Sequence, residues 1–139
     1  MSRDEELLSS IKKHLRFLET KHDFSLRKDQ PGLYYLESER CEIQVLLEYN
    51  RKLHIAIAPF GKTRDDILKN SVRPGRIEIK IVSTCVNSRY SFEDTPWDTI
   101  SDIDKELAHY SKLIKRYCKK MVRGIFSQWP MIRECIKKR

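Results

Sequence analysis

The chain has 139 residues, of which 28 are Lys or Arg and 20 are Asp or Glu, so its formal net charge is +8. This length predicts a single domain, residues 1–139, that can bury a core without metals or disulfides. No apolar run approaches the roughly 20 residues that cross a bilayer, and the polar N-terminus lacks the apolar stretch of a signal peptide, so we expect a cytoplasmic protein that does not contact the membrane.

The first predicted element is an amphipathic helix. Ser2 and Glu5 have the spacing of a capping box at its start. Its apolar residues recur at intervals of three and four: Leu7, Leu8, Ile11, Leu15 and Leu18. We expect one helix that ends near Thr20.

After Gly32 the apolar residues recur every second position instead of every 3.6 positions, and this change predicts strands. Four are expected, at residues 33–37, 41–49, 53–59 and 77–81. Pro59 ends the third, because proline cannot donate to a strand ladder. Residues 61–74 are expected to form a connection that contains one helical turn capped by Thr63.

A long helix is predicted between a cap at Ser101 and a left-handed stop at Gly124. A helical wheel gathers one apolar side, which contains Ile103, Leu107, Tyr110, Ile114, Tyr117, Cys118 and Met121. The opposite side is basic and contains Lys105, Lys112, Lys115, Arg116, Lys119, Lys120 and Arg123. Ser127 is expected to cap a short last helix.

The element order predicts an α+β fold. It consists of an N-terminal helix, a four-stranded antiparallel meander, then a long helix and a short C-terminal helix packed on one sheet face. On the other face, a small apolar patch is expected, formed by Leu46, Ala56, Ala58 and Val82 and ringed by Glu42, Glu48, Glu78 and His54. A solvated face is the favoured interpretation of this patch over a docking site.

The excess positive charge lies in the last quarter of the chain. Residues 105–139 hold 11 of the 28 basic residues and 2 of the 20 acidic ones, so they carry +9 and residues 1–104 carry −1. Between Lys112 and Arg123 there is no acidic residue at all. Two interpretations stand equally: a surface that binds phosphate or an acidic protein, and a solvated face whose lysines complement the helix dipole.

Little in the sequence points to catalysis. The four histidines, His14, His22, His54 and His109, have no metal-ligand spacing, and no nucleophile or phosphate-loop motif is present. The widely spaced Cys41, Cys85, Cys118 and Cys135 are expected to be buried reduced thiols. We therefore expect no enzyme activity, no cofactor and no metal. Convergence of His54 with Glu42 or Glu48 in a cleft would favour an enzyme.

Several short motifs resemble those of small bacterial α+β immunity-type proteins, which neutralise toxins. These are residues 17–24 (FLETKHDF), 35–38 (YLES), 48–51 (EYNR) and 123–129 (RGIFSQW). The resemblance implies a non-enzymatic protein that binds and inhibits a cognate toxin, often a nuclease.

The leading hypothesis is thus a binding protein for a partner with an acidic surface. The expected contact residues are Lys112, Arg116, Lys119, Lys120 and Arg123, with Arg64, Arg73 and Arg76 as a second choice. The alternative is a nucleic-acid-binding module that uses the same basic helix face for phosphates. Exposure of Trp97 or Trp129 beside the lysines would favour the alternative, because exposed aromatic rings stack on bases.

Overall fold

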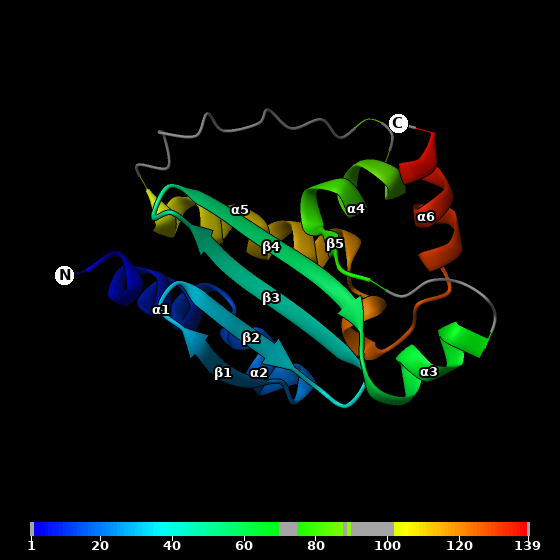
Figure 1. Ribbon diagram of the computed structural model, residues 1–139, viewed down its shortest axis with the longest axis horizontal. Helices are drawn as coiled ribbons and strands as arrows, with labels where there is room; N and C mark the ends of the chain where they lie inside the picture. The colour runs from blue at the N-terminus through cyan, green and yellow to red at the C-terminus, as the bar shows by residue number, and fades with distance from the viewer. Residues whose placement is uncertain (1, 70–74, 88, 90–101, 139) are drawn as a thin grey trace.

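The computed structural model describes residues 2–69, 75–87, 89 and 102–138 (Figure 1). These residues form six α-helices, one 3-10 helix and five strands. In chain order they are α1 (Arg3–His14), α2 (Arg16–His22), β1 (Ser25–Gln30), β2 (Leu33–Glu37), β3 (Cys41–Glu48), β4 (Lys52–Pro59), α3 (Gly61–Lys69), β5 (Ile77–Glu78), α4 (Ile79–Val86), α5 (Ile103–Tyr117), η1 (Met121–Arg123) and α6 (Trp129–Lys137). The architecture is α+β, as predicted.

The strands form one antiparallel sheet in the order β1-β2-β3-β4-β5. The meander predicted over residues 33–59 is confirmed, and its register pairs Tyr34 with Val45 and Val45 with Ile55. Strand β1 was not predicted from the sequence. It is an edge strand in which Leu26 alone is partly buried, so it lacks the apolar alternation that marks a strand.

The predicted fourth strand, residues 77–81, is wrong beyond its first two residues. Only Ile77 and Glu78 pair with β4, and the chain then turns into α4. Ile79, Val82 and Ser83 recur at helical spacing and are fully buried. The sequence pattern of this segment is compatible with a strand as well as a helix, and the helix is the form that buries these three side chains in the core. Val82 consequently lies in α4 and not on the outer sheet face.

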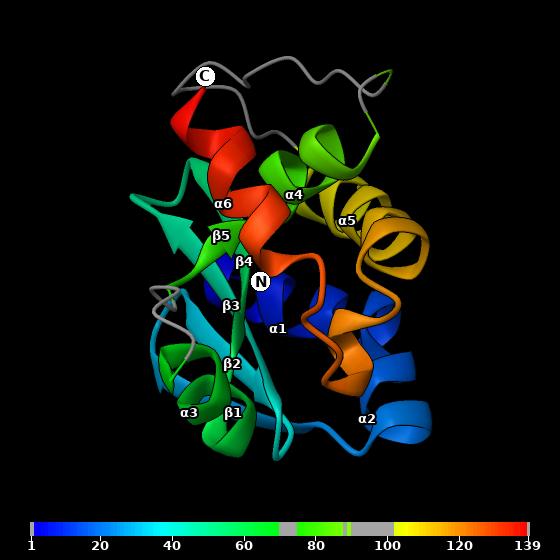
Figure 2. The same ribbon diagram turned by 90° about the vertical axis from the view of Figure 1, so that its right-hand side faces the viewer.

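The predicted N-terminal helix is two helices. The Ser2 hydroxyl accepts a hydrogen bond from the Glu5 N–H at 3.1 Å, so the predicted cap is confirmed. The helix breaks at Leu15, whose side chain is buried, and α2 continues to His22. Figure 2 shows α2 on the same side of the sheet as α1.

The carboxylate of Asp4 ties α1 to the β1–β2 hairpin. It accepts hydrogen bonds from Lys28 Nζ at 2.8 Å, from the Gly32 N–H at 2.7 Å and from the Tyr34 hydroxyl at 3.0 Å. The hydrogen bond from Lys28 is the largest influence on this carboxyl group, and the pKa of Asp4 is lowered. The negative charge of Asp4 therefore stabilises this junction.

The long helix is shorter than predicted. It begins at a cap formed by Asp102, whose side chain accepts the Lys105 N–H at 3.0 Å; the predicted cap, Ser101, lies outside the described residues. It ends at Tyr117, and the 3-10 helix η1 carries the chain to Gly124, which is left-handed (φ 85°) as predicted. The predicted cap of the last helix is wrong, because the residue before α6 is Gln128, without a side-chain cap.

The helices α1, α2 and α5 lie behind the sheet in Figure 1 and to its right in Figure 2. The inward residues of β3 and β4 are all buried, as predicted: Cys41, Ile43, Val45, Leu47, Leu53, Ile55 and Ile57. They pack with fully buried residues of α1 and α5 such as Leu7 and Leu107, and with Trp129 of α6. This one-sided core leaves the outer side of α5 in solvent.

Two of the four cysteines contradict the prediction of buried reduced thiols. Cys85 of α4 and Cys135 of α6 form a disulfide, with their Cα atoms 5.9 Å apart. The pairing depends on α4 being a helix, which brings Cys85 against α6. Cys41 and Cys118 are buried and free, as predicted.

Candidate binding surface

A group of exposed cations covers the solvent side of α5, the turn that follows it, and η1. We call this group the basic surface; its members are Lys112, Lys115, Arg116, Lys119, Lys120 and Arg123. The opposite side of α5 buries Leu107, Tyr110 and Ile114. Because apolar residues recur with the helical period and pack against the core, the lysines and arginines between them are forced outward.

None of the six cations forms an ion pair with any described residue. The two acidic residues of α5 are engaged elsewhere: Asp104 pairs with Lys13 of α1 at 3.5 Å, and Glu106 contacts Lys80 of α4 at 3.7 Å. Two of the cations lie against aromatic rings instead: Lys115 Nζ is 4.6 Å from the centre of Phe17, and Arg116 is 5.5 Å from that of Tyr117. Aromatic contacts leave the net charge of the surface unchanged.

The second-choice residues lie elsewhere. Arg76 Nε donates to Glu42 Oε1 at 2.7 Å, so its charge is largely compensated. Arg64 and Arg76 line one hollow of about 210 Å³ together with Glu42, and this hollow shares no lining residue with the basic surface. Arg73 lies outside the described residues. The structure therefore brings the five first-choice residues into one surface and separates Arg64 and Arg76 from it.

Sequence reasoning missed two cations that lie next to the basic surface. Arg40, in the β2–β3 turn, and Lys62, at the start of α3, are both exposed and have no ion pair among the described residues. Arg40 is 83 positions before Arg123 in the sequence. No periodic pattern connects residues that are so far apart, and only the folded sheet brings the turn to η1.

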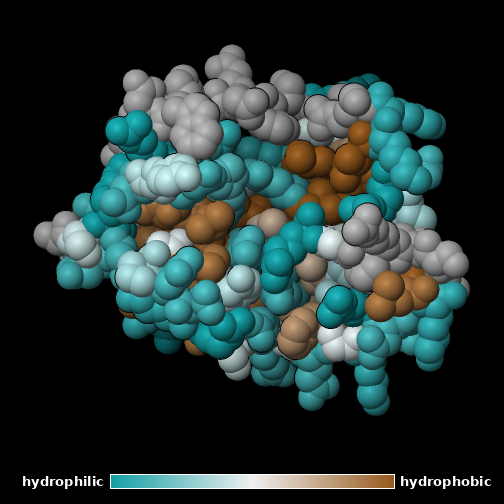
Figure 3. Space-filling view, viewed as in Figure 1, coloured by the Kyte–Doolittle hydropathy of each residue, from teal (hydrophilic) through white to brown (hydrophobic). Residues whose placement is uncertain are grey.

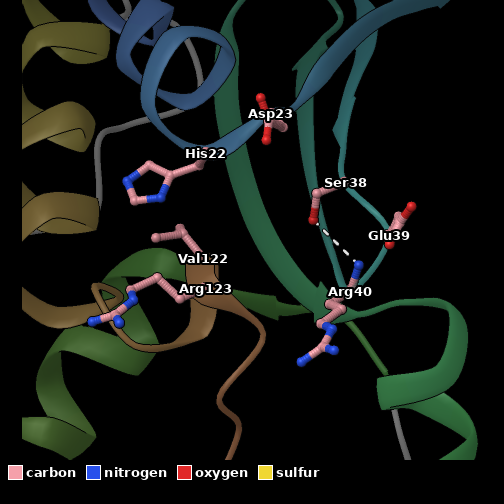
Figure 4. Close-up of a pocket in the computed structure, with 7 residues that line it drawn as sticks. All are labelled: His22, Asp23, Ser38, Glu39, Arg40, Val122 and Arg123. Atoms are coloured by element: carbon pink, nitrogen blue, oxygen red, sulfur yellow. Dashed lines mark hydrogen bonds between the residues drawn. The ribbon is translucent and has the colours of Figure 1, made fainter.

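Arg40 lies between two hollows on the surface. The first hollow, of about 360 Å³, is lined by His22, Asp23, Ser38, Glu39, Arg40, Val122 and Arg123 (Figure 4). The second, of about 330 Å³, is lined by Arg40, Lys62, Thr63, Asp66, Ile67, Gly124 and Phe126. Arg123 joins the first hollow to the basic surface.

The turn that carries Arg40 is held by its own side chains. The Ser38 hydroxyl accepts hydrogen bonds from the backbone N–H groups of Arg40 (3.3 Å) and Cys41 (3.1 Å). The alkyl stem of Arg40 packs on Gly124, where an added Cβ would lie 2.6 Å from Arg40 Cδ. Because Gly124 has neither a side chain nor a negative φ, the Arg40 stem can approach η1 this closely.

The outer sheet face carries a polar network across its strands. His54 Nε2 lies 2.9 Å from Glu48 Oε2, and its Nδ1 lies 3.4 Å from Glu78 Oε2. The Tyr110 hydroxyl donates to Glu78 Oε1 at 2.9 Å. His54 thus lies beside Glu48, but an enzyme would be favoured only if the two converged in a cleft, and neither residue lines any of the three hollows described above. The contacts of His54 instead link strands β3, β4 and β5.

The apolar patch predicted on this face is largely covered. Ala58 is buried, Leu46 is half-buried, and Val82 belongs to α4. Figure 3 shows apolar atoms on this side in separate groups, divided by hydrophilic ones. The four residues therefore do not form the predicted patch.

The buried thiols are not nucleophiles. Burial raises the pKa of Cys118 to about 12 and that of Cys41 well above its usual value, so both stay protonated at neutral pH. Among the described residues, no group of three or more histidine, cysteine or acidic side chains is arranged to hold a metal ion.

In the described parts of the chain, no helix is both long and apolar enough to cross a membrane. Comparison with protein families, with curated proteins and with solved structures finds no match to this chain.

Proposed function

We propose that the protein is a non-enzymatic binding protein that attaches to an acidic surface of a protein partner through the basic surface. In this proposal it acts as an immunity-type inhibitor, which neutralises a cognate toxin by covering it. One observation carries the proposal: six exposed cations lie on one side of the molecule without an ion pair among the described residues.

Without a bound partner, the like charges of the basic surface destabilise the folded protein. Side chains three or four positions apart on a helix are about 5–6 Å from each other, which is within the Debye length of about 8 Å at physiological salt. The cations therefore repel one another. An acidic partner removes this repulsion on binding and is also attracted from a distance, so charge raises the association rate and selects the partner.

Nucleic acid is the second candidate, because phosphates suit the same cations. The aromatic residues near the basic surface argue against it. Trp129 and Tyr110 are fully buried and Phe126 is nearly so. Phe17 and Tyr117 are half-buried, and Lys115 and Arg116 already lie over their rings, so none of the five offers an open ring on which a base could stack. Trp97 lies outside the described residues. These observations favour a protein partner.

The test is affinity capture from untreated and nuclease-treated cell lysates with three versions of the protein. The first is the unaltered chain. The second is Lys112→Glu, Arg116→Glu and Arg123→Glu together. The third is a matched control, Lys12→Glu, Arg51→Glu and Lys138→Glu, which changes the net charge equally at exposed sites away from the basic surface.

We expect one stoichiometric protein in both lysates, kept by the control and weakened at least about tenfold by the triple change in the basic surface. The loss should be largest near 50 mM salt and shrink towards about 300 mM, because salt screens the charges. Equal affinity of the two charge-reversed proteins would contradict the proposal. Recovery of RNA or DNA, with every partner lost after nuclease, would replace it with the nucleic-acid function.

A further inference from the structure

Among the described residues, β5 is the strand that pairs through the fewest residues. It lies at one edge of the sheet and pairs with β4 through Ile77 and Glu78 only, before the chain turns into α4 (Figure 1). Every other pair of neighbouring strands shares at least five residue pairs. Side-chain contacts therefore contribute a large part of what holds β5 to the sheet.

The carboxylate of Glu78 is held from two sides. Its Oε1 accepts a hydrogen bond from the Tyr110 hydroxyl of α5 at 2.9 Å, and its Oε2 lies 3.4 Å from His54 Nδ1 of β4. The other ring nitrogen of His54, Nε2, lies 2.9 Å from Glu48 Oε2 of β3. The imidazole of His54 thus lies between two carboxylates, with one ring nitrogen facing each.

The protonation state of this ring decides whether both contacts are favourable. A neutral imidazole has one N–H donor and one nitrogen with a lone pair, and here that lone pair faces a carboxylate oxygen. A protonated imidazole donates from both nitrogens and carries a positive charge that the two carboxylates favour. The side chain of His54 is 25% exposed, so solvent screens these interactions only in part.

We infer that His54 forms a pH-sensitive link, which fastens β5 to the sheet when its ring is protonated and loosens β5 when the ring is neutral. The inference is independent of the proposed function. Histidine side chains change charge between about pH 5 and 8, a range in which glutamates are ionised. Because the paired strand favours the protonated ring, the link is present at the acidic end of this range and is lost as the pH rises.

The other charged groups near the ring do not reverse this direction. Lys52 lies opposite Glu48 in the register of β3 and β4, and Lys80 of α4 contacts Glu106 at 3.7 Å. Lysines and glutamates keep their charge over this range, so they change the strength of the link and not its pH dependence. Burial lowers the pKa of His109, which interacts with Lys80 and Glu106, so His109 loses its proton at a lower pH than an ordinary histidine.

Loosening β5 affects a limited part of the molecule. Arg76, directly before β5, donates to Glu42 of β3 at 2.7 Å, and separation of β5 would break this ion pair and expose the backbone edge of β4. Helix α4 remains attached, because Ile79 and Val82 are fully buried in the core. The pH change therefore opens one sheet edge and leaves the rest of the fold in place.

The test is native-state hydrogen exchange followed by NMR at about pH 5.5 and about pH 8, with rates corrected for the intrinsic effect of pH. The readout is the opening constant of the protected backbone amides in residues 56–57 and 77–78, which join β4 to β5. His54→Gln is the informative variant, because glutamine keeps hydrogen-bonding groups and does not titrate. His14→Gln is the matched control, since His14 lies 2.9 Å from Asp104 between α1 and α5.

We expect the opening constant to rise about tenfold from the lower to the higher pH in the unaltered protein and in His14→Gln, because a charge-assisted contact is lost. In His54→Gln the change should be less than about twofold. In the unaltered protein at the lower pH, heteronuclear NMR should show a proton on each ring nitrogen of His54.

An equal pH response in His54→Gln and the unaltered protein would overturn the link. A constant opening in the unaltered protein would also overturn it, and so would a ring nitrogen of His54 without a proton at the lower pH. Should His54→Gln fail to fold, Glu48→Gln takes its place, because it removes one of the two carboxylates that favour the protonated ring. An undiminished pH response in Glu48→Gln would contradict the inference.

Discussion

The disulfide between Cys85 and Cys135 provides the largest predicted effect on stability. It links α4 to α6, and the two cysteines are 50 residues apart in the chain. Reduction opens this loop in the unfolded state and leaves the folded contacts between the two helices in place. The effect therefore falls mainly on the entropy of the unfolded chain.

The loop length sets the magnitude. For a loop of this size, the chain-entropy relation gives about 4 kcal/mol at 25 °C. With an unfolding entropy of roughly 2.1 cal/mol/K per residue, the same difference corresponds to a fall of about 14 °C in Tm. In urea, with a slope of about 2 kcal/mol/M, it corresponds to a fall of about 2 M in the midpoint.

The assay is urea unfolding followed by circular dichroism, with and without a phosphine reductant, on the unaltered protein and on Cys85→Ser with Cys135→Ser. Reductant should lower the midpoint of the unaltered protein and leave that of the double variant unchanged. The reasoning would be refuted if oxidised and reduced protein unfolded at the same urea concentration. Four free thiols in the oxidised protein by mass spectrometry would refute the pairing itself.

Three further predictions concern single sites. Asp4→Ala should lower the free energy of unfolding by about 2 kcal/mol, because it leaves the hairpin donors unpaired. Since the pKa of Asp4 is lowered on folding, its contribution is present above the unfolded pKa of about 3.9 and lost as the pH falls through the folded value; acid unfolding of Asp4→Asn should lack this component. Gly61→Ala should cost about 2 kcal/mol or more in a urea titration, because φ is 59° there and a Cβ would collide with a backbone oxygen of the β2–β3 turn; an unchanged midpoint would exclude this backbone arrangement. Cys41 and Cys118 should not react with a thiol reagent in the native protein and should both react in denaturant, whereas rapid native labelling would show that they are accessible.

Local periodicity was sufficient to predict the central part of the fold. The alternation around Ile43 and Val45 has period 2 and few competing interpretations, so the meander and its buried face could be predicted. The apolar residues of the segment that begins at Ile77 fit both the strand period of 2 and the helix period of 3.6. Whether the chain forms a helix after Glu78 depends on which residues pack against it. Packing against distant parts of the chain determines that this segment is helical, and a local sequence pattern does not show which residues will pack together.

The candidate site divides in the same way. The outward position of Lys112, Arg116 and Arg123 follows from the helix period, and the structure places all three in solvent. The place of Arg40 beside Gly124 depends on how a sheet turn meets η1, and no local pattern encodes this contact. The partner of Cys85 is also non-local, because four cysteines allow three pairings and spacing does not choose among them.

In the proposed function, the basic surface is the interface with the partner. Zero-length carbodiimide crosslinking of the captured complex tests it most directly, because this reagent joins lysine amines to carboxylates that already touch them. We expect links from Lys112, Lys115, Lys119 and Lys120 to Asp or Glu residues of the partner, mapped by mass spectrometry. Links confined to lysines elsewhere, such as Lys12, Lys69 or Lys138, would contradict it.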